Sequence, residues 1–303
     1  MNKPFTQFNI PTIQGFIAIL LWSMTVGLVR SVSEQVGTLT SAVVIYFVSG
    51  TIGVIAALSR KRLNSLIKSE SKQYFLICGA LFVAYMLFFF LAIGRAVDRE
   101  QVIVAGLLNY LWPVMTLLGS VLILKKKAKW YLIPATILAL SGIFLVIVPD
   151  AGEFTFSNVS GSLEVYIYGI LAAFSWALYS ILAGKLGKNI DKGSVTVFLL
   201  ATSAVLLFPA LFSNERSVWS LGVIVEIMIM STATFIAYEF WDKAMRKGSV
   251  TTVAAFSYLT PLFSTVFSSL YLAVIPTATL WTGCIILIIG SFLSWRSVIE
   301  EKK

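Results

Sequence analysis

Ten apolar segments, each long enough to cross a lipid bilayer as a helix, follow one another along the chain with mostly short loops between them. Because hydrocarbon offers the backbone no hydrogen-bonding partner, a spanning segment must satisfy its own amides and carbonyls, as a helix does. The chain is 58% hydrophobic and 12% charged, whereas an average soluble domain carries about 25% charged residues. The sequence therefore predicts an all-α integral membrane protein, with transmembrane helices at about 13–32, 40–58, 73–94, 101–123, 130–148, 165–184, 194–212, 220–242, 249–273 and 279–295.

Basic residues gather in alternate loops of this arrangement. With both termini in the cytoplasm, all but four of the 23 Lys and Arg residues fall on the cytoplasmic side, the exceptions being Arg30, Arg95, Arg99 and Arg216. This asymmetry follows the positive-inside rule. We therefore expect both termini in the cytoplasm, and we attribute the net charge of +9 to membrane orientation and not to binding of a nucleic acid.

Two motifs occur once in each half of the chain. A Gly-x-x-Ala-x-x-x-Trp pattern opens the first half at Gly15 to Trp22 and the second at Gly169 to Trp176. A Tyr-Leu-x-Pro pattern lies in the fourth predicted span of each half, at Tyr110 to Pro113 and at Tyr258 to Pro261. The spacing indicates an internal duplication.

The duplication predicts two five-helix repeats, residues 1–150 and 151–303, within one membrane domain. Because each repeat has an odd number of spans, the second enters the membrane from the opposite side, which makes this an inverted-topology repeat. Such symmetry allows two mirrored arrangements, each open to one face of the membrane. Transport by alternating access is the function that uses this property.

The second motif places polar groups at membrane depth. Proline has no amide hydrogen, so Pro113 releases the carbonyl of Asn109 from its helical bond, and Pro261 releases that of Ser257. Hydrocarbon tolerates such groups only where protein or a water-filled cavity satisfies them. We interpret the two sites as the floor of a substrate cavity, and the alternative is a pair of packing kinks.

Two tryptophans lie near the middle of their predicted spans, Trp22 and Trp176, whereas Trp130, Trp219 and Trp295 lie at span ends, as interfacial anchors do. A mid-membrane indole offers a flat apolar face for ring stacking and a hydrogen-bond donor. Such faces suit a neutral amino acid with a large side chain, and the alternative is ordinary core packing. The candidate substrate-binding residues are Trp22, Tyr85, Asn109, Tyr110, Trp112, Pro113, Trp176, Tyr179, Tyr238, Ser257, Tyr258 and Pro261. Trp241, in the same predicted span as Tyr238, is a weaker candidate.

Residues for catalysis or metal binding are scarce. The chain has no histidine, and Cys78 and Cys284 lie far apart within predicted spans, so we predict no catalytic residue, no metal site and no cofactor. An integral-membrane enzyme and a non-transporting scaffold are the least favoured functions. Glu239 could carry a coupling proton, but Lys243 follows at i+4, so an ion pair is the favoured interpretation.

Ten spans in two halves that share these motifs resemble the EamA branch of the drug/metabolite transporter superfamily. Within it, the chain is similar to the aromatic amino acid exporters in four stretches, which are Leu21 to Ser23, Ser31 to Glu34, Ile45 to Gly50 and Asn109 to Pro113. The resemblance implies export of aromatic and other neutral amino acids, and related small compounds, through a central cavity in the bacterial cytoplasmic (inner) membrane.

The chain departs from the superfamily pattern at two charged positions. Lys125 stands where many members carry a glutamate at the end of the fourth span, and Glu239 stands where a small residue is expected. We predict facilitated export down a gradient, because acids within spans are few and no nucleotide motif is present. The alternative driving force is proton antiport through Glu239. The alternative substrates are hydrophobic drugs or quaternary cations, exported with or without proton coupling. One chain in the bilayer is expected to suffice, because a two-repeat transporter carries its own site.

Overall fold

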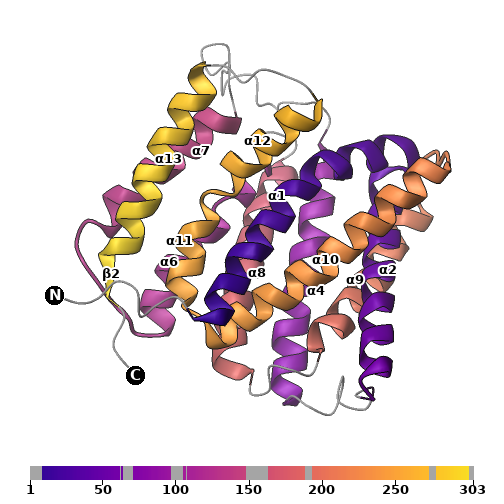
Figure 1. The fold of residues 1–303 in the computed structure, drawn as a ribbon, viewed down its shortest axis with the longest axis horizontal. Coiled ribbons are helices and arrows are strands. Elements are labelled where there is room, and N and C mark those ends of the chain that lie inside the picture. Colours follow the sequence, from indigo (N-terminus) through magenta and orange to yellow (C-terminus); the bar gives the residue numbers. More distant parts are fainter. Residues whose placement is uncertain are drawn as a thin grey trace.

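The computed structural model describes residues 9–61, 63, 71–96, 105–106, 108–147, 163–187, 193–272 and 278–299. Within these ranges the chain is almost entirely helical, and one short antiparallel pairing joins two strands (Figure 1). The elements are α1 (Ile10–Val36), α2 (Thr38–Ser59), α4 (Lys72–Arg95), α6 (Trp112–Ile123), β1 (Lys127–Ala128), α7 (Leu132–Ile147), α8 (Leu163–Leu186), α9 (Ser194–Leu211), α10 (Leu221–Lys247), α11 (Val250–Ser257), α12 (Thr260–Leu272), α13 (Ala278–Ser297) and β2 (Val298–Ile299).

Each of the ten predicted spans contains helix, and the all-α membrane fold is confirmed. Some helices are longer than predicted. α1 extends to Ile10 and Val36 because Asn9 caps its first turn, its side chain accepting the amide of Thr12 at 3.0 Å, and because Gly37 then turns the chain at a φ of 92°. A polar cap at the first end and a glycine with positive φ at the other therefore set the bounds of this helix.

The Tyr-Leu-x-Pro motifs divide their spans more sharply than a kink would. Tyr258 and Leu259 form a turn that separates α11 from α12, and Tyr110 and Leu111 form a turn before α6. Each proline then lies in the first turn of the helix that follows, where its missing amide hydrogen costs little. The fourth and ninth spans are thus broken helices.

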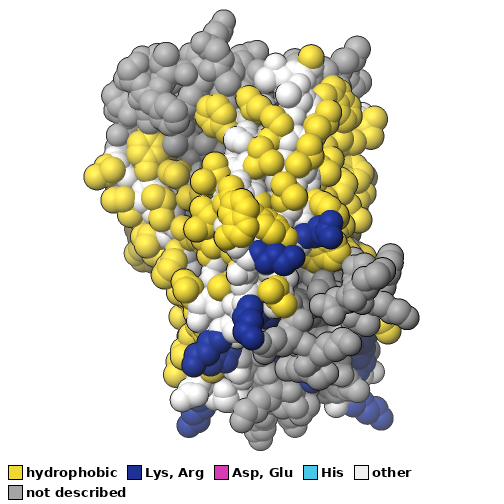
Figure 2. All heavy atoms as spheres, turned by 90° about the vertical axis from the view of Figure 1, so that its left-hand side faces the viewer, with side chains coloured by type: hydrophobic (Ala, Val, Ile, Leu, Met, Phe, Trp, Pro, Cys, Tyr) yellow, Lys and Arg dark blue, Asp and Glu magenta, His cyan; other side chains and the backbone are white. Residues whose placement is uncertain are grey.

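The surface has the pattern of a membrane protein. Among the residues that the structure describes, five helices, α2, α4, α8, α9 and α10, are long and apolar enough to cross a bilayer, and α1, α6, α7 and α13 contain shorter apolar stretches. On the face that Figure 2 shows, apolar side chains form a broad band, and Lys and Arg side chains gather below it. The chain is therefore a multi-pass membrane protein.

Helices of the two halves pack against each other in a pattern that is unchanged when the halves are exchanged. α1 packs along α10, as α8 packs along α4, and α1 also packs on α12, as α8 packs on α6. α2 lies along α9 and α7 along α13, so each of these pairs joins equivalent helices. The interface between the halves runs through the middle of the bundle (Figure 1).

Glycines allow α7 and α13 to approach closely. A Cβ atom on Gly142 would lie 2.5 Å from the backbone nitrogen of Leu287, and one on Gly290 would overlap the backbone of Ala139. Small residues at such crossings let helix backbones pack in membranes, where the hydrophobic effect does not drive helices together. Each of these two glycines therefore faces the backbone of the other helix.

Gly142→Ala and Gly290→Ala are each expected to destabilise the protein by about 1–3 kcal/mol, the usual cost of overpacking. A backbone atom is not able to rotate away as a side chain does, so the two helices must separate. The midpoint of thermal unfolding in detergent, followed by tryptophan fluorescence, measures the effect. Gly94→Ala is the matched control, because no atom lies within 4 Å of the position its Cβ would take. Equal midpoints for all three variants would contradict the prediction.

Candidate substrate-binding site

Aromatic side chains from five helices meet inside the bundle. We call this group the central aromatic cluster, and its members are Trp22, Tyr85, Trp112, Trp176, Tyr179, Tyr238 and Trp241. The ring of Trp22 on α1 lies 5.6 Å from that of Trp176 on α8 and 5.2 Å from those of Tyr238 and Trp241 on α10, measured between centroids. Rings from both halves therefore share one core.

Trp176 lies at the centre of this cluster. Its ring centroid is 4.8 Å from that of Tyr85, 5.1 Å from that of Tyr179 and 6.3 Å from that of Trp112. It also stacks on Trp241 at 5.8 Å, with an angle of 29° between the ring planes. The indole is 2% exposed, so a substrate ring reaches it only by taking the place of a neighbouring ring.

Helical spacing explains how the sequence assembles the cluster. Tyr238 and Trp241 are three residues apart on α10 and share a face, as do Trp176 and Tyr179 on α8. Trp112 starts α6 directly after the turn. Buried alanines at positions 18, 172 and 173 let the helices that carry these rings approach one another. The indole of Trp241 donates to the Ser180 hydroxyl at 3.1 Å.

The structure brings six of the predicted residues into the cluster, namely Trp22, Tyr85, Trp112, Trp176, Tyr179 and Tyr238. Trp241, a weaker candidate on sequence grounds, lies among them and is fully buried. Asn109 is buried and lies beside Tyr85.

Tyr110 and Tyr258 lie elsewhere. Both pack in a neighbouring core formed with α6, α7 and α13, around Leu117 and Leu287. In the turn between α11 and α12, the hydroxyl of Thr260 donates to the carbonyl of Ser257 at 2.7 Å. The carbonyl that Pro261 releases thus has a partner within the turn. A substrate-binding role for Pro113, Ser257 and Pro261 stays a prediction.

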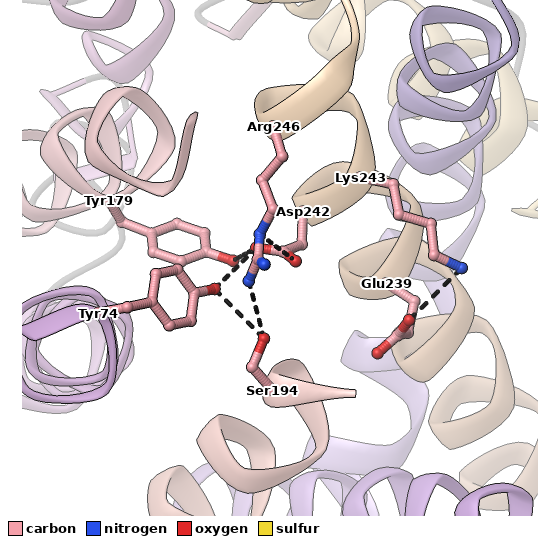
Figure 3. Close-up of polar contacts among 7 residues, drawn as sticks. All are labelled: Tyr74, Tyr179, Ser194, Glu239, Asp242, Lys243 and Arg246. Atoms are coloured by element: carbon pink, nitrogen blue, oxygen red, sulfur yellow. Dashed lines mark hydrogen bonds and ion pairs between the residues drawn. The ribbon is translucent and has the colours of Figure 1, made fainter. Parts of the chain in front are cut away.

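Sequence reasoning missed a polar network beside the cluster, which Figure 3 shows. Asp242 and Arg246 on α10 form an ion pair, with 2.9 Å between Oδ2 and Nε. The other carboxylate oxygen, Oδ1, accepts the hydroxyls of Tyr74 at 3.0 Å and Tyr179 at 3.1 Å. Arg246 donates to the Ser194 hydroxyl at 2.8 Å and lies 4.3 Å from the ring centre of Tyr74. We call these five residues the Asp242–Arg246 network.

Two acid–base pairs at i,i+4 spacing follow each other on α10. Glu239 and Lys243 form the favoured ion pair, with 3.6 Å between Oε2 and Nζ, and their side chains are 16% and 22% exposed. The side chains of Asp242 and Arg246 are 6% and 1% exposed. In sequence the two pairs look alike, and only the tertiary neighbours distinguish them. Proton coupling through Glu239 stays a prediction.

Metal-ligating side chains do not gather in the ranges described, where no three His, Cys, Asp or Glu side chains are grouped to hold an ion. Cys78 and Cys284 are both buried as free thiols. The chemistry available in the cluster is therefore ring stacking, hydroxyl and indole hydrogen bonding, and the paired charges of the neighbouring network.

Comparison with known proteins identifies the family. The EamA-like transporter family matches residues 10–148 and 163–296. The chain is 32% identical to the aromatic amino acid exporter YddG of Salmonella typhimurium, and 32% identical to that of Escherichia coli K12, in each case over 94% of this chain and 96% of the relative. The exporter of the same name from Ancylobacter novellus is 28% identical over 92% of this chain and 95% of the relative.

A crystal structure also shares the fold. It superimposes with a TM-score of 0.78 at 24% sequence identity, covering 94% of this chain and 96% of that one. This likeness concerns the fold alone, while the family match covers most of both halves of the chain. The chain belongs to the EamA-like transporter family.

Proposed function

We propose that this transporter exports aromatic and other neutral amino acids, and related small compounds, from the bacterial cytoplasm through the centre of the bundle. The central aromatic cluster carries this proposal, because its rings lie where helices of the two halves meet. Indole and phenol faces stack on an aromatic side chain, and few polar groups are needed to orient the rest of a small substrate. The relatives named aromatic amino acid exporters support the same substrate class.

The two halves, residues 1–150 and 151–303, are proposed to be inverted repeats that rock against each other. The exchange-symmetric packing of α1 with α10 and of α8 with α4 supports this mechanism. Rings that now pack on one another would separate on one side of the cluster as the halves move. One chain is then sufficient for transport, with lipid as its surroundings.

We place the protein in the cytoplasmic membrane with both termini inside. α1 begins and α13 ends at the same lower side of the bundle, and α2, α8 and α10 also end there (Figure 1). The exposed basic residues Lys125, Lys127, Lys129 and Arg296 lie at that side, because Arg296 is in the last turn of α13 and the segment with the three lysines pairs through β1 with β2, directly after α13. We propose facilitated diffusion as the driving mechanism, because Lys243 already pairs with Glu239.

The direct test is counterflow of labelled phenylalanine, tryptophan and threonine into proteoliposomes that contain the purified protein. Uptake that excess unlabelled phenylalanine blocks, and that a pH gradient does not accelerate, supports the proposal. Aromatic faces also attract cations, so choline and ethidium serve as competitors. Movement of ethidium without uptake of any amino acid would replace this proposal with drug efflux.

Trp22→Ala is expected to remove phenylalanine counterflow while leaving expression unchanged. The side chain is only partly buried but contacts the rings of Trp176, Tyr238 and Trp241, so its loss changes the cluster more than the fold. Trp130→Ala is the matched control, because Trp130 is 85% exposed at the start of the fifth span. Wild-type flux in Trp22→Ala would remove this residue from the site.

A further inference from the structure

The Asp242–Arg246 network and the central aromatic cluster share the same helices. Tyr179 belongs to both, because its hydroxyl donates to Asp242 at 3.1 Å and its ring lies 5.1 Å from that of Trp176. Trp241, the residue before Asp242 on α10, lies 5.3 Å from Trp112. A buried pair of opposite charges therefore adjoins a stack of aromatic faces.

The two charges place a strict condition on any ligand that comes between them. Each is nearly inaccessible to water, so each needs an opposite charge to offset its lost hydration. A ligand with a single charge would pair with one residue and leave the other uncompensated. A zwitterion compensates both, because its ammonium group suits Asp242 and its carboxylate suits the guanidinium fork of Arg246.

We propose that Asp242 and Arg246 recognise the ammonium and carboxylate groups of a zwitterionic amino acid whose side chain stacks in the central aromatic cluster. The inference rests on the proposed function and adds to it the residues that bind the charged groups of the substrate. Binding exchanges one ion pair within α10 for two ion pairs with the substrate. The net charge of the buried site stays the same throughout.

The surrounding hydroxyls suit this exchange. Tyr74 and Tyr179 hold one oxygen of Asp242, and Ser194 holds one amino group of Arg246, so both charges stay oriented when they separate (Figure 3). These three partners come from α4, α8 and α9, and α10 carries the charges. Hydrogen bonds from neighbouring helices to both charged groups hold those groups in position.

The Glu239–Lys243 pair fits the role less well. Its side chains are more exposed and its atoms lie further apart, so solvent screens each charge when the pair opens. A ligand gains little by replacing such a contact. The Asp242–Arg246 pair is the buried one of the two, and Tyr179, which bonds to it, lies against the ring of Trp176.

The test measures how much the ammonium group and the carboxylate of the substrate each contribute to binding. Purified full-length protein is loaded with labelled phenylalanine, which is then displaced by unlabelled phenylalanine, by phenethylamine, which lacks the carboxylate, or by 3-phenylpropionate, which lacks the ammonium group. We expect each analogue to displace the label on the order of 100-fold more weakly than phenylalanine, because it leaves one buried charge unpaired.

The double variant Asp242→Asn with Arg246→Gln removes both charges and leaves none unpaired, so it is expected to fold. In this variant the three compounds should displace the label within roughly threefold of one another. The matched control, Arg95→Gln with Glu164→Gln, removes an exposed ion pair at the other end of α4 and α8 and should keep the wild-type ranking.

Either of two results overturns the inference. One is a wild-type protein that binds phenylalanine but ranks the three compounds equally, and the other is a double variant that keeps the full preference. Both leave the proposed function standing, since phenylalanine still binds. Failure of the wild type to bind phenylalanine or to catalyse its counterflow would instead overturn the proposed function, and this inference with it.

Discussion

Asp242→Asn alone is expected to lower the free energy of unfolding by about 3–5 kcal/mol, the usual cost of removing one partner from a buried ion pair. Arg246 would keep its charge inside the bundle, with a side chain that is 1% exposed. The hydroxyls of Tyr74 and Tyr179 would also lose an ionised acceptor. Thermal or denaturant unfolding in mild detergent, followed by tryptophan fluorescence, measures the loss.

The double variant separates charge from packing. Asp242→Asn with Arg246→Gln should recover most of the lost stability, because no unpaired charge remains and the asparagine oxygen can still accept the hydroxyls of Tyr74 and Tyr179. Arg95→Gln is the surface control, and since its pair with Glu164 is exposed we expect a change of at most about 1 kcal/mol. If Asp242→Asn alone were as stable as the double variant, the unpaired charge of Arg246 would carry no cost in stability, which would contradict the prediction.

The fold could be predicted from the sequence because its signal is local. An apolar run of about twenty residues is sufficient to indicate a spanning helix, whatever its neighbours. The mid-span position of Trp22 and of Trp176 likewise pointed to rings that face protein, and the structure brings the two together at 5.6 Å. The length of an apolar segment and the position of a tryptophan within it therefore predicted the spans and the buried rings without any knowledge of tertiary contacts.

The polar network depends on tertiary contacts that local patterns do not contain. Tyr74 bonds to a residue 168 positions away and Ser194 to one 52 positions away. An i,i+4 pair at a helix end has the same appearance whether lipid, water or protein surrounds it. Local spacing therefore indicated an ion pair for Glu239 and Lys243 but gave no signal that Asp242 and Arg246 are the buried pair.

Proline chemistry was only partly predictive. It correctly located the interruptions at Pro113 and Pro261, since a missing amide hydrogen always breaks the helical bond. It did not specify a two-residue turn, nor that Thr260 would supply a hydroxyl to the released carbonyl. Nor did it indicate that Tyr258, within this turn, packs toward α7 and α13 and outside the central aromatic cluster.

Trp176→Ala is expected to reduce phenylalanine counterflow by about tenfold or more, because an aromatic contact contributes roughly 0.5–1.5 kcal/mol beyond burial and Trp176 touches most rings of the cluster. Threonine has no ring to stack, so its counterflow should fall less than that of phenylalanine. The ratio of the two rates is thus the measured quantity, and it is independent of how much protein folds.

Trp176→Phe is the conservative partner in this experiment, because it keeps an aromatic face at the same position while it shortens the ring. We expect it to retain most of the phenylalanine preference, although the smaller side chain leaves a gap beside Trp241 and Tyr85. If Trp176→Ala lowered the counterflow of phenylalanine and of threonine by the same factor, the indole would support only the fold. Loss confined to ring-bearing substrates would place the indole face against the substrate ring, as stacking in the cluster requires.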